Sequence, residues 1–303
     1  MIPVIIPSYR RQDQLRKCLE HLSRQTIPVE VFIHENTRDN IYYTAAINKG
    51  IRKYLDKDCD YIVTLNQDMY MQPDAIEKIV LFMDSHPQCG IASPLQVHSD
   101  NPGYAIWGGG YEAFPAGRHK HGHLSEFESD EQVLWCNGSC MVLRKRMIEE
   151  IGLFDENMLF LGSDSDYCFT ARSRNWQVWR VGSAKGTHEY GASGAGTDPG
   201  MEAIKASDML YFGRKWLTGE LYRSLAYEGS ECTPATVTQM MADLESVRGE
   251  LIKAQLHHID AGDKPRETAA ASQVSESNIV ELKPDRSTSH YGEILLRPDS
   301  ARS

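Results

Sequence analysis

The chain has 303 residues, 41% of them hydrophobic and 24% charged, and a formal net charge of −10. This length accommodates one large α/β domain with an appendage, or two modest domains. The acidic balance argues against nucleic acid as the main partner, because phosphate backbones are bound by basic surfaces. The 7 cysteines are scattered without a CxxC pair, which indicates reduced thiols and offers no zinc site.

The N-terminal half alternates short apolar runs with amphipathic stretches. Strands are expected at 4–6, 29–33, 61–65 and 90–93, and helices at 11–24, 45–55 and 73–85. The continuous apolar run Val4-Ile5-Ile6 is typical of a strand that is buried on both faces of a parallel sheet. This order predicts a parallel, doubly wound sheet with ligands at the carboxyl ends of the strands.

The regular pattern fails between Pro94 and about Glu131, which indicates a loop-rich insertion. Within it, the turn Trp107-Gly108-Gly109-Gly110 is expected to shape the mouth for an acceptor, and the histidine tract 118–123 is interpreted as a charged loop, with metal binding as the alternative. Regular structure then returns, with expected strands at 133–143 and 177–181 and expected helices at 145–151, 166–175 and 203–216.

The last part of the chain changes character. Residues 233–256 form an amphipathic pattern, and the apolar stripe of this expected helix either pairs with a second copy of the chain or packs on the preceding domain. The residues after it contain almost no aromatic side chains and are expected to be mostly disordered. The expected domains are therefore 1–217, a helical extension at 218–257 and a tail at 258–303.

Three polar features follow expected strands or begin expected helices. Asp68 follows the strand that ends at Leu65, Asp164 and Asp166 begin a helix, and His188 follows a strand. Each feature has a structural interpretation, as a turn cap, as first-turn acids or as a hydrogen-bonded histidine. Each also has a functional one, because carboxylates hold Mg²⁺ or Mn²⁺ and a single acid can be a general base.

These features occur in a fixed order with further motifs, and together they resemble the GT-A fold glycosyltransferases of family 2, particularly the bacterial rhamnosyltransferase-like members. The resemblance covers about residues 2–217. It implies an α/β fold with a Rossmann-like, mostly parallel sheet flanked by helices, here with a helical C-terminal extension. The motifs are Val4-Ile5-Ile6-Pro7-Ser8-Tyr9-Arg10, His34-Glu35-Asn36, Ala46-Ile47-Asn48-Lys49-Gly50, Leu65-Asn66-Gln67-Asp68, Asn137-Gly138-Ser139-Cys140-Met141-Val142-Leu143-Arg144, Ile151-Gly152-Leu153-Phe154-Asp155-Glu156, Asp164-Ser165-Asp166-Tyr167-Cys168-Phe169-Thr170-Ala171-Arg172 and His188.

The resemblance also implies roles for individual residues. Asp164 corresponds to the general base, and Asp68 and His188 correspond to ligands of Mn²⁺ or Mg²⁺. The implied nucleotide-sugar contacts are Pro7, Tyr9, Arg10, Glu35, Asn48, Lys49, Asn66, Gln67 and Asp68. The implied acceptor contacts are Trp135, Asn137, Gly138 and Asp166. The implied reaction is an inverting, metal-assisted transfer of a hexosyl or deoxyhexosyl group from a UDP-, dTDP- or GDP-sugar to a hydroxyl of a growing polysaccharide, a lipid-linked glycan or a similar acceptor.

The sequence departs from the family pattern at three positions. Asn66 replaces the first acid of the DxD metal motif, Ser163 replaces the Glu that precedes the base, and Glu35 replaces an Asp. These changes keep a second hypothesis open, in which the chain is a catalytically degenerate module that binds nucleotides or glycans. A nucleotidyltransferase is disfavoured, because its Gly-rich phosphate loop is absent after the first expected strand.

No apolar run approaches transmembrane length and no signal peptide precedes the first expected strand, so a cytoplasmic protein is expected. The mixture of Phe212, Arg214, Lys215 and Trp216 has two interpretations. These side chains either touch the inner face of a membrane that carries a lipid-linked acceptor, or the aromatic ones pack against the sheet.

Overall fold

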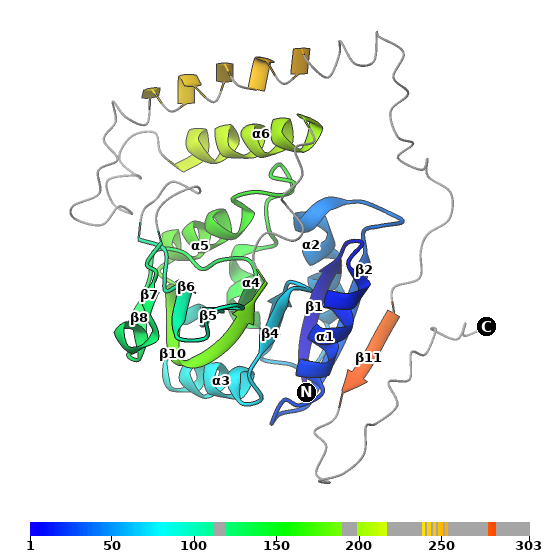
Figure 1. The fold of residues 1–303 in the computed structure, drawn as a ribbon, viewed down its shortest axis with the longest axis vertical. Coiled ribbons are helices and arrows are strands. Elements are labelled where there is room, and N and C mark those ends of the chain that lie inside the picture. The colour runs from blue at the N-terminus through cyan, green and yellow to red at the C-terminus, as the bar shows by residue number, and fades with distance from the viewer. Residues whose placement is uncertain are drawn as a thin grey trace.

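The computed structural model describes residues 1–111, 119–189, 199–216 and 278–282, together with residues 238, 239, 241–243, 245, 246, 248–250, 252 and 253. A central sheet lies between helices, and a long helix, α6, lies across one end (Figure 1). The elements are β1 (Ile2–Ser8), α1 (Gln12–Leu22), β2 (Val29–Glu35), α2 (Tyr42–Tyr54), β3 (Tyr61–Leu65), β4 (Met69–Met71), α3 (Ala75–Ser85), β5 (Cys89–His98), β6 (Tyr104–Trp107), β7 (Gly122–His123), η1 (Leu124–Phe127), β8 (Glu131–Gln132), β9 (Cys140–Arg144), α4 (Lys145–Ile151), α5 (Ser163–Ser173), β10 (Gln177–His188), α6 (Pro199–Trp216) and β11 (Asn278–Leu282).

The sheet is mixed, and its strand order is β11-β2-β1-β3-β9-β5-β10-β4. The strand β1 runs parallel to β2 and β3, and β5 runs parallel to β10, as expected for a doubly wound fold. The strand β9 lies between β3 and β5 and is antiparallel to both. The expected α/β sheet is therefore present, but an antiparallel strand separates its two parallel parts.

Both faces of the sheet carry a hydrophobic core. Val4 and Ile6 of β1 point into the cluster that includes the buried side chains of α1 and α3, while Ile5 points into the cluster that includes those of α2 and α5. Because successive side chains of a strand alternate between faces, a strand that is covered on both sides must be apolar throughout. This is why the short run at the N-terminus predicts β1 correctly.

The insertion after β5 is more ordered than the sequence predicts, since it contains β6, β7, η1 and β8. Its glycine-rich turn packs on aromatic rings. A Cβ atom on Gly110 would lie 2.2 Å from the Trp135 ring, and one on Gly108 would lie 2.4 Å from the Phe127 ring. Only glycines permit this close packing, so the turn has a structural role.

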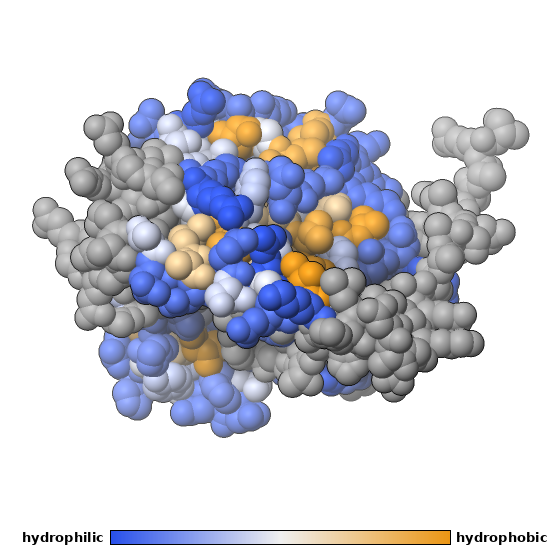
Figure 2. Space-filling model, turned by 90° about the horizontal axis from the view of Figure 1, so that it is seen from above, coloured by the Kyte–Doolittle hydropathy of each residue, from blue (hydrophilic) through white to orange (hydrophobic). Residues whose placement is uncertain are grey.

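The aromatic residues of α6 also face inward. Phe212 and Trp216 are buried, and their rings lie 5.4 and 5.6 Å from the ring of Phe169. These two side chains are therefore buried inside the protein against α5, which contradicts the membrane-contact interpretation for them. The described part of the end of the molecule seen in Figure 2 is mostly hydrophilic, with separate apolar groups. Among the described helices, none has the length and apolar character needed to cross a bilayer.

Described residues between 238 and 253 are helical and lie along α6 (Figure 1). Met241 packs against the core, and Arg214 forms an ion pair with Glu245 at 3.2 Å, so this part of the extension docks on the domain within one chain. The strand β11 pairs antiparallel with β2 at the edge of the sheet, inside the segment expected to be disordered. The structure describes residues 278–282 of this tail as a strand, and the rest of the tail lies outside the described residues.

Candidate active site

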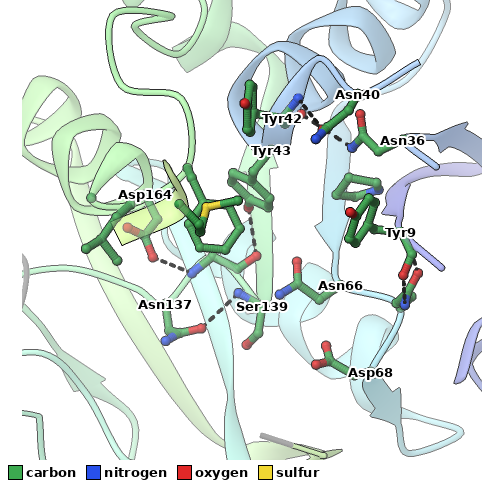
Figure 3. Close-up of a pocket in the computed structure, with 17 residues that line it drawn as sticks. Tyr9, Asn36, Asn40, Tyr42, Tyr43, Asn66, Asp68, Asn137, Ser139 and Asp164 are labelled. Atoms are coloured by element: carbon green, nitrogen blue, oxygen red, sulfur yellow. Dashed lines mark hydrogen bonds between the residues drawn. The ribbon is translucent and has the colours of Figure 1, made fainter. Parts of the chain in front are cut away.

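A pocket opens at the carboxyl ends of β1 and β3, where the topology predicts a ligand (Figure 3). The space inside it, including the open solvent at its mouth, is about 930 Å³. Its lining residues are Pro7, Tyr9, Asn36, Asn40, Tyr42, Tyr43, Asn66, Gln67, Asp68, Asn137, Gly138, Ser139, Phe160, Leu161, Gly162, Asp164 and Met201.

The sheet register explains why distant parts of the sequence meet here. The strand β9 is antiparallel to β3, so Cys140 at its beginning pairs with Leu65 at the end of β3. The turns that flank these two residues are therefore neighbours, and the Asn66 amide donates to the Ser139 carbonyl at 2.8 Å. The strand β10 pairs with β4 in the register His188 to Met69, which brings His188 next to Asp68.

Asp164 lies on one wall of the pocket, in the first turn of α5. Its Oδ2 accepts a hydrogen bond from the Gly138 amide at 2.7 Å, and its Oδ1 accepts one from the Ser165 amide at 2.8 Å. Burial raises the pKa of this carboxyl, and the two amides oppose the rise. The result is a positioned carboxylate with increased affinity for a proton.

Tyr43 completes this wall. Its hydroxyl donates to the Gly138 carbonyl at 2.8 Å, while the amide of the same glycine binds Asp164 (Figure 3). A Cβ atom on Gly138 would lie 2.8 Å from the Tyr43 hydroxyl and 3.2 Å from the Asp164 Cβ. The glycine therefore lets one peptide unit connect the tyrosine with the carboxylate.

Asp68 lies on the opposite side of the pocket and is 3% exposed. Its Oδ1 is buried without a hydrogen-bond partner among the described residues and lies 3.6 Å from the His188 Nε2. His188 is held from its other ring nitrogen, because Nδ1 lies 3.0 Å from the Gln96 Oε1. A buried carboxylate oxygen and an oriented imidazole form a donor set that fits a divalent cation.

The site provides only part of a coordination shell. Within the described ranges, no group of three or more His, Cys, Asp or Glu side chains could hold a metal ion. The side-chain amide of Asn66 also lines the pocket, beside Asp68. Cations such as Mg²⁺ are commonly bound by one or two carboxylates, with substrate phosphates and waters as the other ligands. Asp68 and His188 fit that pattern.

The side chain of Gln67 holds the backbone of Tyr9, which also lines the pocket, in place. Its side-chain oxygen accepts from the Tyr9 amide at 2.8 Å, and its side-chain nitrogen donates to the Tyr9 carbonyl at 3.1 Å. This pair of hydrogen bonds fixes the segment after β1 on the β3–β4 turn. In the structure Gln67 therefore orients Tyr9, and Pro7, Tyr9, Asn66 and Asp68 lie around the same cavity.

Three expected site residues are placed outside the pocket by their own partners. Asn48 is fully buried, and its side chain bonds with both the amide and the carbonyl of Phe154, at 3.0 and 2.9 Å. Asp166 accepts from the Trp216 indole at 2.5 Å and pairs with Lys215 at 2.9 Å. Trp135 is buried in the core beside Trp107. The sequence pattern cannot show which face of a helix or strand these residues occupy.

Arg10, Glu35 and Lys49 also lie outside the pocket lining. The Arg10 amide donates to Thr37, whose own amide donates to the Glu35 carboxylate at 3.0 Å, so these residues organise the turn after β2. The Lys49 ammonium lies 3.3 Å from the His34 ring. Among the described residues that line the pocket there are two carboxylates and no Lys or Arg.

Several lining residues are absent from the sequence-based predictions, among them Asn40, Tyr43 and Met201. The motif spacing gave no reason to select them. Tyr42 has φ 61°, an uncommon conformation for a bulky residue, and it begins α2 three residues before the expected start. This turn directs Tyr43 into the pocket. Met201 lies on α6, beyond the last motif.

Residues 43–193 match the model of a protein family described as glycosyltransferase like family 2. The chain carries a family 2 glycosyltransferase domain. Among curated proteins, the glycosyltransferase is similar to the N-acetylglucosaminyl-diphospho-decaprenol L-rhamnosyltransferase of Mycobacterium tuberculosis, in two strains. The identity is 23% over 246 residues, which cover 66% of this chain and 79% of the relative. The resemblance inferred from the motifs is confirmed.

Solved structures show the same fold for the glycosyltransferase. GalNAc-T7 in complex with UDP, GalNAc and Mn²⁺ matches with a TM-score of 0.53 and 11% identity, over 81% of this chain but only 55% of that chain. TarS residues 1–349 of S. aureus in complex with UDP-GlcNAc matches with a TM-score of 0.50 and 13% identity, over 81% of this chain and 72% of that chain. These matches confirm the α/β GT-A fold.

Proposed function

We propose that this glycosyltransferase transfers a sugar from a nucleotide-sugar to a hydroxyl acceptor with inversion at the anomeric carbon, and that Asp164 is the general base. The observation that carries the proposal is the position of Asp164. Among the described lining residues it is the one carboxylate on its wall, it is held by two amides, and it lies across the cavity from Asp68 (Figure 3). The relatives support the donor class, since TarS was solved with UDP-GlcNAc.

In the proposed step, the acceptor oxygen forms a bond to the anomeric carbon while its proton moves to the Asp164 carboxylate. The bond between that carbon and the phosphate oxygen breaks on the opposite face, and the nucleoside diphosphate leaves with the bonding electrons. One displacement therefore inverts the anomeric configuration. Burial strengthens Asp164 as a base, and the Gly138 amide keeps its lone pairs oriented.

We also propose that Asp68 and His188 hold Mn²⁺ or Mg²⁺, with Asn66 beside them. When bound, the ion would neutralise charge that develops on the leaving diphosphate. The pocket supports the need for a cation, because its described lining residues include two carboxylates and no Lys or Arg side chain. A diphosphate would otherwise meet uncompensated negative charge in a partly buried site.

The acceptor that we propose is a hydroxyl of a glycan, either a growing polysaccharide or a lipid-linked glycan. The curated relative is named for an acceptor of the second kind, an N-acetylglucosaminyl-diphospho-decaprenol. The cytoplasmic side of a membrane is a location compatible with such an acceptor. The sugar and the nucleotide are to be identified by screening UDP-, dTDP- and GDP-sugars.

The test compares the wild type with Asp164→Asn across this donor panel, with Mn²⁺ or Mg²⁺. The variant should lose transfer by about 10²–10⁴-fold, the usual contribution of a general base, and should keep nucleotide affinity within about twofold. Asp74→Asn is the control, because the Asp74 side chain forms an exposed ion pair with Lys78 at 2.7 Å and does not line the pocket. A normal rate in Asp164→Asn removes this residue as the base. Nucleotide binding by the wild type without turnover of any donor supports a degenerate binding module.

A further inference from the structure

We infer that Asp208 of α6 is a positioning residue for the transfer site, which holds the apolar wall of the pocket in place. This inference rests on the proposed function of the pocket. The helix α6 begins at Pro199, after the segment 43–193 that matches the family model. It nevertheless contributes Met201 to the pocket lining.

The contacts of Asp208 are directed at one loop. Its Oδ1 accepts from the Leu159 amide at 3.0 Å, and its Oδ2 accepts from the amides of Phe160 and Leu161 at 2.8 and 2.9 Å. The side chain is 2% exposed. Phe160 and Leu161 line the pocket directly. A single buried carboxylate on α6 thus binds three consecutive amides of the wall.

The geometry requires a carboxylate. Three consecutive amide groups that converge on one point need acceptors, and buried amides without acceptors are strongly disfavoured. A carboxylate accepts with both oxygens, whereas an asparagine has one acceptor oxygen and presents an NH₂ group to the remaining amide. Burial raises the pKa of Asp208, and the three amides oppose the rise.

The loop connects this carboxylate to the proposed base. Leu161 is followed by Gly162, whose φ of 79° places it in the left-handed region, and the Gly162 carbonyl accepts the first hydrogen bond of α5, from the Asp166 amide at 2.8 Å. Asp164 lies in that first turn. At its other end, the loop accepts a hydrogen bond from α2, because the Thr44 amide donates to the Leu159 carbonyl at 3.2 Å. A shift of the loop therefore moves the wall between Tyr43 and Asp164.

A general role in attaching α6 is the competing explanation, and the structure separates the two. A second contact also attaches α6, because the Tyr211 hydroxyl donates to Asp155 at 3.0 Å and accepts from the Asn157 side-chain amide at 3.3 Å. Tyr211→Phe loosens α6 without removing the hydrogen bonds between Asp208 and the amides of residues 159–161. Ser207→Ala removes only a bond within the helix, from the Ser207 hydroxyl to the Ala203 carbonyl at 2.8 Å.

The experiment measures two properties of Asp208→Asn, Tyr211→Phe and Ser207→Ala in the full chain. The first is amide hydrogen exchange of residues 159–161, which should accelerate at least about tenfold in Asp208→Asn alone. The second is steady-state transfer, where Asp208→Asn should lower kcat and raise the acceptor KM, each by about tenfold. Its affinities for UDP, dTDP and GDP should match those of the wild type.

Unchanged exchange in Asp208→Asn overturns the inference, and so does an equal loss of kcat in Tyr211→Phe. If Asp208→Asn does not fold, Asp208→Glu provides the test, because it keeps both acceptor oxygens. This variant should fold and show values of amide exchange and kcat between those of the wild type and those expected for Asp208→Asn. Wild-type values for both measurements contradict the inference. Parallel measurement of Asp164→Asn separates the two proposals. A wild-type rate there refutes the base, whereas an inactive Asp164→Asn with a fully active Asp208→Asn refutes only the positioning role.

Discussion

Lys215→Met tests whether Asp166 has the structural role that its contacts indicate. The Lys215 ammonium lies 2.9 Å from the Asp155 Oδ2 and 2.9 Å from the Asp166 Oδ1. The Asp166 side chain is 2% exposed, and the Trp216 indole is its other charge-stabilising donor. These contacts join the end of α6 to α5. Methionine preserves the length and the apolar stem of lysine but removes the charge.

The expected loss of unfolding free energy follows from the two carboxylates. Burial opposes ionisation of Asp155, yet Lys215 and neighbouring donors lower its pKa to about 2, which corresponds to about 2 kcal/mol of stability at neutral pH. Removing one partner of a buried ion pair costs about 3–5 kcal/mol. Because the Lys215 side chain is 31% exposed, solvent reduces this figure, and we expect a total loss of about 3 kcal/mol.

Urea denaturation of the wild type, Lys215→Met and the double variant Asp166→Asn/Lys215→Met measures this loss. The double variant should recover part of it, because no unpaired buried charge remains. In Lys215→Met, burial keeps the pKa of Asp166 higher in the folded state than in the unfolded state. The folded state then retains a proton that the unfolded state releases, so the loss should be larger near about pH 8 than near about pH 5. A loss below about 0.5 kcal/mol would refute the structural role.

Three further predictions concern Asp164 and Asp68, which line the pocket, and Asn48, which lies outside its lining. Because burial raises the pKa of Asp164, kcat/KM should fall with decreasing pH, with a midpoint above about 3.9, the ordinary pKa of Asp. A pH–rate profile measures this midpoint, and a midpoint at or below that value contradicts the prediction. Asp68→Asn should weaken UDP binding in Mn²⁺ and leave the weak binding in EDTA unchanged, as measured by calorimetry; equal affinities in Mn²⁺ would remove Asp68 as a ligand. Asn48→Leu should lower the free energy of unfolding by about 1–3 kcal/mol, because the Phe154 amide loses its partner, without changing UDP affinity. A selective loss of UDP affinity would restore Asn48 to the nucleotide site.

Elements that are buried on both faces could be predicted from the sequence alone. The apolar runs of β1, β2 and β3 carry a strong pattern, because burial imposes it on most positions, and the buried residues of α1 recur at helical spacing along one face. Short strands such as β4, with only 3 residues, carry no such pattern. The direction of β9 could not be predicted, because an apolar run has the same appearance in a parallel and an antiparallel neighbour.

The site residues also divide into those whose position could be predicted from the sequence and those whose position could not. The motifs predict Asp68 and Asp164 at the carboxyl edge of the sheet, and both line the cavity there. Asn48 and Asp166 belong to equally clear motifs, but their side chains point into the protein and bind Phe154 and Lys215. A motif fixes the place of a residue along the chain, whereas the orientation of its side chain depends on packing partners that lie far away in sequence. Asp208 is another such partner, and no spacing marks it.

The anomeric configuration of the product tests the central proposal most directly. Nuclear magnetic resonance of the first-formed product, made from a donor of known configuration, measures the coupling of the anomeric proton. A single displacement with Asp164 as the base predicts the configuration opposite to that of the donor, and product formation about 10²–10⁴-fold slower from Asp164→Asn. Retention of the donor configuration would contradict the proposed mechanism.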